Sequence, residues 1–173
     1  MERTISTPRL MHSASGVMSA AYSSINRRAL RVKQAGMVAL QFVSDFPDGN
    51  LFIADGRKHV PFEIKRVFFI NCLANPKAIR GKHAHKTLEQ IIFCVAGSFV
   101  VHLDDGKTRQ RITLNDPSWG IWLGPLLWHS MTSFSYDCVI LVIASGPFDE
   151  ADYIRDYEMF LRYSESAQPC SCK

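Results

Sequence analysis

The chain has 173 residues, of which 47% are hydrophobic and 21% are charged, and its formal net charge is +4. This length suits one domain with a substantial core, and the composition is that of an ordinary globular protein. The positive charge belongs to the start of the chain: residues 1–36 hold six Arg or Lys and one acid, while the rest holds 14 basic and 15 acidic residues. A near-neutral domain offers no electrostatic footprint for nucleic acid, and no apolar run is long enough to span a membrane, so we expect neither as a partner.

Residues 1–36 are rich in Ser, Ala, Met and Arg and lack the apolar centre of a secretory signal. We expect them to form a basic, flexible N-terminal extension. Two alternative interpretations are that these residues form an organelle transit peptide, or that the natural chain starts at Met37 and the start codon used here lies upstream of it. We expect the folded domain to cover residues 37–163, and residues 164–173 to form a flexible tail.

Three of the five cysteines, Cys72, Cys94 and Cys138, lie inside apolar strand-like segments. A free thiol in such a place behaves as a small hydrophobic side chain. Their spacing shows no disulfide framework, which favours reduced cysteines and a cytoplasmic protein.

From residue 38 onward, short apolar segments alternate with turn residues. Strands are predicted at residues 38–43, 51–54, 64–73, 98–103, 109–114, 120–123, 131–134 and 138–144, and around the segment 80–96. The turn Asp104-Asp105-Gly106 is a strong hairpin signal. Many short strands without alternating helices indicate a sandwich or a barrel.

The end of the chain departs from this pattern. Asp149 and the acids that follow it suit the start of a helix, which we expect to run through Tyr163. Ile154, Tyr157 and Leu161 fall three and four residues apart, so this helix would pack one face on the barrel.

Histidines supply the clearest chemical signal. His83 and His85 stand two apart, so both imidazoles project from the same face of a strand. Glu89 follows four positions later, and His129 arrives about forty residues further on. Neutral imidazoles and a carboxylate suit Fe, Mn, Ni or Zn, so a metal site made of these four residues is one hypothesis.

The motifs around these histidines resemble those of the cupin-fold nucleotide-sugar 3,4-ketoisomerases. The resemblance extends over about residues 38–163 and is carried by Arg80-Gly81-Lys82-His83-Ala84-His85-Lys86, Gln90, Leu103-Asp104-Asp105-Gly106, Gly124-Pro125-Leu126-Leu127-Trp128-His129, Ala144-Ser145 and Asp152-Tyr153-Ile154-Arg155-Asp156-Tyr157 with Phe160. The motifs are specific as a set, whereas His-x-His alone would indicate only a cupin.

The resemblance implies an all-β fold, a single cupin-type jelly-roll β-barrel with a short C-terminal α-helix, assembled as a homodimer. It implies an enzyme of deoxysugar biosynthesis that moves the ketone of a dTDP-4-keto-6-deoxyhexose from C4 to C3 through an enediol, with no metal or other cofactor. His83 and His85 would shuttle the protons, which suits a side chain whose pKa lies near neutrality. Arg80 would face the diphosphate, and the substrate would also contact Gln90, Trp128 and His129.

Two departures from the family pattern keep other hypotheses open. Phe68 and Phe69 stand where the family has tyrosines, one of which is thought to assist proton transfer, and phenylalanine has no hydroxyl. Asp48-Gly49 replaces a basic or tyrosine-containing turn, and its carboxylate would repel a diphosphate. Besides the isomerase, we therefore consider a catalytically degenerate cupin that only binds a nucleotide sugar, and the metal-dependent enzyme.

Overall fold

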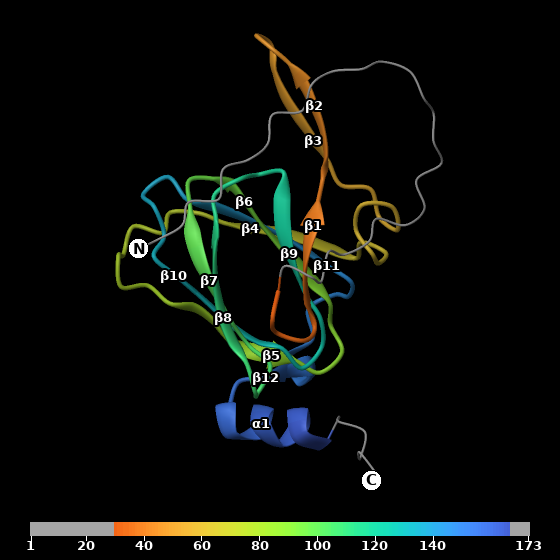
Figure 1. Cartoon of the computed structure of the whole chain (residues 1–173), viewed down its shortest axis with the longest axis vertical. Helices are drawn as coiled ribbons and strands as arrows, with labels where there is room; N and C mark the ends of the chain where they lie inside the picture. The colour runs from red at the N-terminus through yellow and green to blue at the C-terminus, as the bar shows by residue number, and fades with distance from the viewer. Residues whose placement is uncertain (1–29, 167–173) are drawn as a thin grey trace.

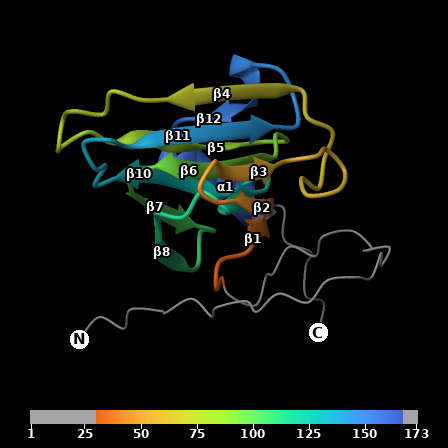
Figure 2. The same cartoon turned by 90° about the horizontal axis from the view of Figure 1, so that it is seen from above.

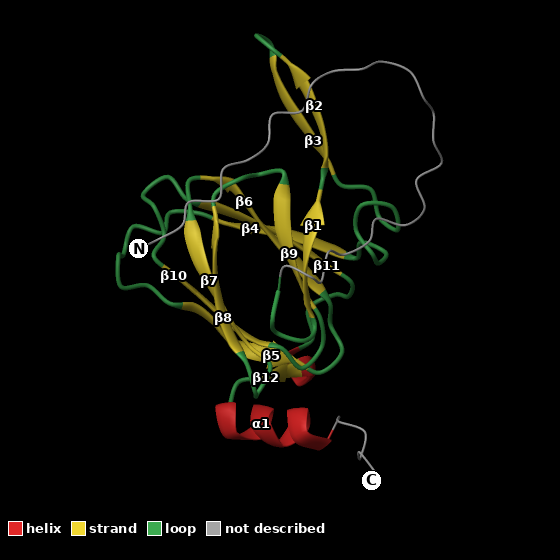
Figure 3. Cartoon of the chain, viewed as in Figure 1, coloured by secondary structure: helices red, strands yellow, loops and turns green. Residues whose placement is uncertain are grey.

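Two five-stranded antiparallel sheets form the body of the protein in a computed structural model that describes residues 30–166 (Figures 1 and 3). The first sheet has the order β1-β9-β6-β11-β4, with bounds Ala35–Ala39, Trp119–Leu123, Gln90–Ala96, Val139–Ala144 and Arg66–Ile70. The second has the order β12-β5-β10-β7-β8, with bounds Tyr153–Ile154, Arg80–His85, Trp128–Thr132, Phe99–Asp104 and Arg109–Leu114. The sandwich or barrel expected from the strand pattern is confirmed.

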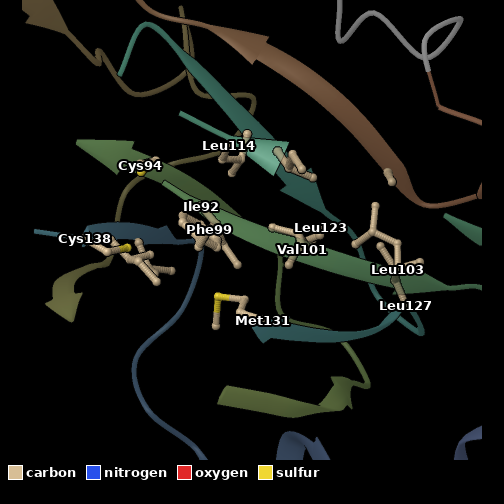
Figure 4. Packing of buried hydrophobic residues seen from close by; sticks show 14 of the residues in the cluster. Ile92, Cys94, Phe99, Val101, Leu103, Leu114, Leu123, Leu127, Met131 and Cys138 are labelled. Carbon is tan, nitrogen blue, oxygen red and sulfur yellow. The ribbon is translucent and has the colours of Figure 1, made fainter. Parts of the chain in front are cut away.

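The main core lies between the two sheets. In β7, buried Phe99, Val101 and Leu103 alternate with partly exposed Val100 and His102, as expected for a strand with one face on a core. Figure 4 shows these three side chains meeting Ile92, Leu123 and Met131 from other strands. The turn predicted at Asp104-Asp105-Gly106 joins β7 to β8, and Gly106 adopts a positive φ of 87° there.

A second layer covers the outer face of the first sheet. Val60 and Phe62, from the segment between β3 and β4, pack there on Ile91, Phe93 and Ile143. Strands β6 and β11 are therefore buried on both faces along part of their length, which for β11 agrees with its continuous apolar sequence.

The strand expected at residues 38–43 is two strands. β1 ends at Ala39 and pairs with β9, after which β2 (Gln41–Asp45) pairs with β3 (Gly49–Ile53) to form a hairpin that projects from the barrel (Figure 1). Asp48 lies in the turn at the tip of this hairpin. Within one chain, its carboxylate is therefore remote from the barrel.

The barrel begins before Met37, so the domain boundary expected there is too late. Val32 and Ala35 are only 4% and 2% exposed and belong to the main core. The Arg31 backbone N–H donates to the Gln110 side chain (2.7 Å), which ties this segment to β8. The rest of the expected extension, residues 1–29, and residues 167–173 of the expected tail lie outside the described residues.

The single helix expected over residues 149–163 is interrupted. Asp149 caps a 3₁₀ turn, Glu150–Asp152, and the chain then extends to pair β12 with β5 before the short C-terminal helix α1 (Tyr157–Ser166) begins. The helix packs through Phe160, which is fully buried. Among residues 30–166, no helix has both the length and the apolar character needed to cross a membrane.

Candidate active site

Two neighbouring strands of the second sheet bring three histidines together inside the barrel. His83 in β5 is paired in register with His129 in β10, and their rings lie 4.6 Å apart between centroids. His85 follows on the same face of β5, 5.0 Å from the His83 ring. The alternation of strand side chains thus places both members of the His-x-His motif inward, as the sequence predicted.

A bulge at the start of β5 adds an arginine to this group. Gly81 has a φ of 78°, and a Cβ there would lie 3.0 Å from the backbone oxygen of His129, so only glycine allows the close approach of β5 and β10. Lys82 also has a positive φ, and the pairing with β10 shifts at this point. Because a bulge shifts the alternation, Arg80 lines the same cavity as His83.

The cavity inside the barrel has a volume of about 320 Å³. Four of the side chains expected at the site line it: Arg80, His83, Gln90 and His129. Its remaining wall is largely apolar and includes Phe68, Ile70, Ile79, Ile92, Met131 and Val142. The expected residue His85 is not among the lining residues: it is 3% exposed, and its ring lies 5.0 Å from that of His83.

Asp152 fixes the orientation of His85. Its Oδ2 lies 2.9 Å from His85 Nδ1, and its Oδ1 accepts hydrogen bonds from the backbone N–H and the hydroxyl of Thr87, both at 2.8 Å. With Nδ1 donating to the carboxylate, Nε2 is the unprotonated nitrogen of His85. That nitrogen faces the amide of Gln90 at 3.4 Å.

Burial keeps all three histidines neutral near pH 7. It lowers the pKa of His83 to about 4, helped by the neighbouring His85. Burial also lowers the pKa of His85, but the hydrogen bond and negative charge of Asp152 oppose that effect. Fully buried His129 has a pKa well below its ordinary value. The ring nitrogens Nδ1 of His83 and His129 have no hydrogen-bond partner among the described residues.

Two further polar side chains line the cavity that our functional reading of the sequence had not placed there. Tyr153 lies 4.9 Å from the His83 ring and 4.3 Å from the His85 ring, and Arg155 stacks on Tyr153 at 4.4 Å. They were missed, with Asp152, because their segment resembled the first turns of a helix. The alternation of polar and apolar residues in Tyr153-Ile154-Arg155 could have predicted a short strand here, and in the structure only Ile154 of the three is fully buried.

Trp128 is not part of this site, contrary to the expectation. It precedes His129 in a strand, so its side chain projects from the opposite face of the sheet. It packs there against Tyr157 and Phe160 of the C-terminal segment, at 5.2 and 5.6 Å, and borders a separate open cavity of about 990 Å³.

The four-residue metal set is not assembled either. Glu89 Oε2 accepts a hydrogen bond from Trp122 Nε1 at 2.8 Å and does not line the cavity of the histidines. Within residues 30–166, no three His, Cys, Asp or Glu side chains are grouped to hold one metal ion. The two phenylalanines also separate: Phe68 lines the cavity, whereas Phe69 is 67% exposed on the outer face of β4.

Comparison with known proteins gives matches over almost all of the described chain. The family model described as "FdtA: WxcM-like, C-terminal" matches residues 33–165. The TDP-4-oxo-6-deoxy-alpha-D-glucose-3,4-oxoisomerase of Aneurinibacillus thermoaerophilus is 48% identical over 115 residues, which cover 66% of this chain and 82% of that protein.

Solved structures agree with this assignment. A mutant of the 3,4-ketoisomerase QdtA from Thermoanaerobacterium thermosaccharolyticum, in complex with TDP-4-keto-6-deoxyglucose, superposes with a TM-score of 0.76 at 34% identity, covering 79% of this chain and 97% of that one. The TDP-quinovose 3,4-ketoisomerase WlaRB from Campylobacter jejuni gives 0.72 at 42% identity, with 76% and 99% covered. The cupin-type fold and the family resemblance are confirmed. The chain belongs to the FdtA, WxcM-like C-terminal family, and the relatives named here are 3,4-ketoisomerases of TDP-linked sugars.

Proposed function

We propose that this protein is a sugar 3,4-ketoisomerase that acts on a dTDP-4-keto-6-deoxyhexose in deoxysugar biosynthesis. The observation that carries the proposal is the pair of neutral imidazoles, His83 and His85, beside a cavity inside a barrel of the ketoisomerase fold. At about 320 Å³, the cavity is at the small end of ligand pockets and suits one sugar ring.

The proposed reaction is a proton transfer between neighbouring carbons. A neutral imidazole removes the proton beside the ketone, the enediol forms, and the other carbon is then protonated. His83 lines the cavity, so it is placed to meet the sugar. His85 is held by Asp152, whose negative charge favours the imidazolium, so it is suited to carry the proton between the two steps.

Arginine side chains at the cavity wall suit the negative charge of the substrate. Arg80 and Arg155 both line the cavity and are exposed on their outer sides. Guanidinium groups bind phosphate oxygens through paired hydrogen bonds, so we place the diphosphate beside these two residues. Gln90, from the first sheet, and His129, beside His83 in the second, would contact the sugar ring.

A protein that only binds the nucleotide sugar is the second candidate. Phe68 favours it, because this residue lines the cavity without the hydroxyl of the family tyrosine. Both candidates bind the nucleotide sugar, so a binding measurement does not separate them. An assay of the isomerisation reaction does.

We also propose a cytoplasmic homodimer. The hairpin carries exposed Phe42 and Leu51, and the edge strand β4 carries exposed Val67 and Phe69, so one chain presents two apolar surfaces. Figure 2 shows β4 at the rim of its sheet. A second copy would cover both surfaces, and light scattering of purified protein tests the dimer. Free Cys72, Cys94 and Cys138 are consistent with a reducing compartment.

Incubation with dTDP-4-keto-6-deoxyglucose, followed by NMR of the sugar, tests the activity. Formation of a 3-keto isomer supports the proposal, and the same rate should persist after prolonged chelation. An unchanged sugar together with tight binding would favour the binding-only candidate. Activity that is lost on chelation and restored by one metal would instead support a metal-dependent reaction.

A further inference from the structure

The cavity contains one hydroxyl that the proposed reaction has not yet used. Tyr153 lies in β12, directly opposite His85 in the register of β12 and β5. Its ring contacts the rings of both proposed proton carriers, and its side chain lines the cavity. Among the described residues, its recorded contacts are with rings and with the Arg155 guanidinium, and its hydroxyl has no hydrogen-bond partner.

We infer that the Tyr153 hydroxyl is the acid–base group that serves the two sugar oxygens. This role rests on the proposed isomerase activity. Two features of the structure support it: Tyr153 lines the cavity, and its ring lies 4.9 Å from that of His83, the imidazole placed to meet the sugar.

The protons balance in this scheme. As an imidazole removes the proton from C3, the C3–H electron pair forms the C3–C4 double bond, and the carbonyl oxygen at C4 takes the Tyr153 proton. The enediol, an imidazolium and a tyrosinate result. The tyrosinate then takes the proton from the C3 hydroxyl, the C3 ketone forms, and the imidazolium delivers its proton to C4. Both side chains return to their initial state.

The neighbours of Tyr153 suit a hydroxyl that must carry negative charge for part of the cycle. Arg155 stacks on the ring at 4.4 Å, so a positive charge lies beside the tyrosinate when it forms. The Tyr153 backbone is held by pairing with β5, and Asp152 before it is bound to His85 and Thr87. These contacts hold the Tyr153 phenol in one position beside the histidines, and proton transfer requires such fixed positioning.

Tyr153→Phe is the direct test, because it removes the hydroxyl and keeps the ring that packs on His83 and His85. We expect kcat to fall by roughly 10²–10⁴-fold, with KM and nucleotide-sugar affinity within about threefold of the parent. Tyr136→Phe is the matched control, since Tyr136 is 92% exposed, and it should keep the parent rate.

A double variant tests the chemical logic. Phe68→Tyr in the Tyr153→Phe background returns a hydroxyl to the same cavity. The kcat of this double variant should be at least tenfold higher than that of Tyr153→Phe. A Tyr153→Phe protein that isomerises within threefold of an active parent would overturn the inference while leaving the isomerase proposal intact. A parent that turns over no ketosugar would remove the proposed function, and this role with it.

Discussion

Replacement of Asp152 by asparagine probes how the protein makes His85 a base. The carboxylate accepts hydrogen bonds from His85 Nδ1, from the backbone and hydroxyl of Thr87, and from the backbone N–H of Leu88 at 3.3 Å. In Asp152→Asn, the amide oxygen can keep the contacts with Thr87. The amide nitrogen then faces the Nδ1–H of His85, so donor opposes donor unless the imidazole moves its proton to Nε2.

The expected fall in kcat follows from this change of tautomer. A His85 ring protonated on Nε2 cannot accept a proton there, and its N–H would point at the Gln90 amide. Loss of one positioned acid–base group lowers rates by roughly 10²–10⁴-fold, and we expect that range for kcat. Loss of one charge-assisted hydrogen bond costs about 1.5–3 kcal/mol of the free energy of unfolding.

Isomerisation followed by NMR and urea unfolding measure the two effects on the same preparation. Asp149→Asn is the control, because Asp149 caps the 3₁₀ turn through the Ala151 N–H and asparagine caps equally well. A variant Asp152→Asn with the parent rate would refute the reasoning, since His85 would then need no negative partner. Full loss of rate in the control would show that the segment, rather than the carboxylate, is at fault.

Three further predictions concern the cavity wall, pH and the start of the chain. Phe68→Tyr should raise the isomerisation rate, at a cost of about 1–3 kcal/mol if the hydroxyl finds no partner, while Phe69→Tyr, on the outer face, should leave the rate within twofold; equal effects would contradict the placement of the two residues. The folded pKa of His83, about 4, lies below its ordinary 6.5, so the unfolded chain binds the proton more readily. The resulting stability is complete above pH 6.5 and is lost as the pH falls toward 4, so His83 alone should lower the free energy of unfolding, measured with urea, by about 2 kcal/mol between pH 7.5 and pH 5. The lowered pKa values of His85 and His129 act in the same direction, and His83→Gln should reduce the total difference. Finally, a chain that starts at residue 30 should keep the parent melting temperature, whereas one that starts at residue 37 loses buried Val32 and part of β1 and should melt roughly 6–12 °C lower, given a loss of about 3 kcal/mol; identical melting temperatures would show that this segment adds nothing.

Much of the barrel could be predicted because its strands obey local rules. The turn at Asp104-Asp105-Gly106 joins β7 and β8 as expected, since the Asp105 carboxylate accepts the N–H groups of Lys107 and Thr108 and Gly106 takes the positive φ. The inward pairing of His83 and His85 required only the period of two in a strand. These features depend on neighbouring residues, so the sequence is sufficient to predict them.

The parts that were wrong depend on contacts between distant segments. Asp152, Tyr153 and Arg155 belong to the site because β12 pairs with β5, about seventy residues earlier, and a helix-like composition hides that pairing. Trp128 was included because it belongs to the motif that ends at His129, whereas the two residues are consecutive in β10 and project to opposite faces. The boundary at Met37 failed because Val32 is buried by strands far along the chain.

The central claim is that this barrel moves a proton between C3 and C4 of a ketosugar, and solvent exchange tests it most directly. NMR of dTDP-4-keto-6-deoxyglucose incubated in D₂O should show deuterium entering the sugar together with the 3-keto product, and His83→Asn and His85→Asn should each abolish both while binding the nucleotide sugar within about tenfold of the parent. A parent that binds the sugar but leaves its protons unexchanged would contradict the account, as would histidine variants that exchange as fast as the parent.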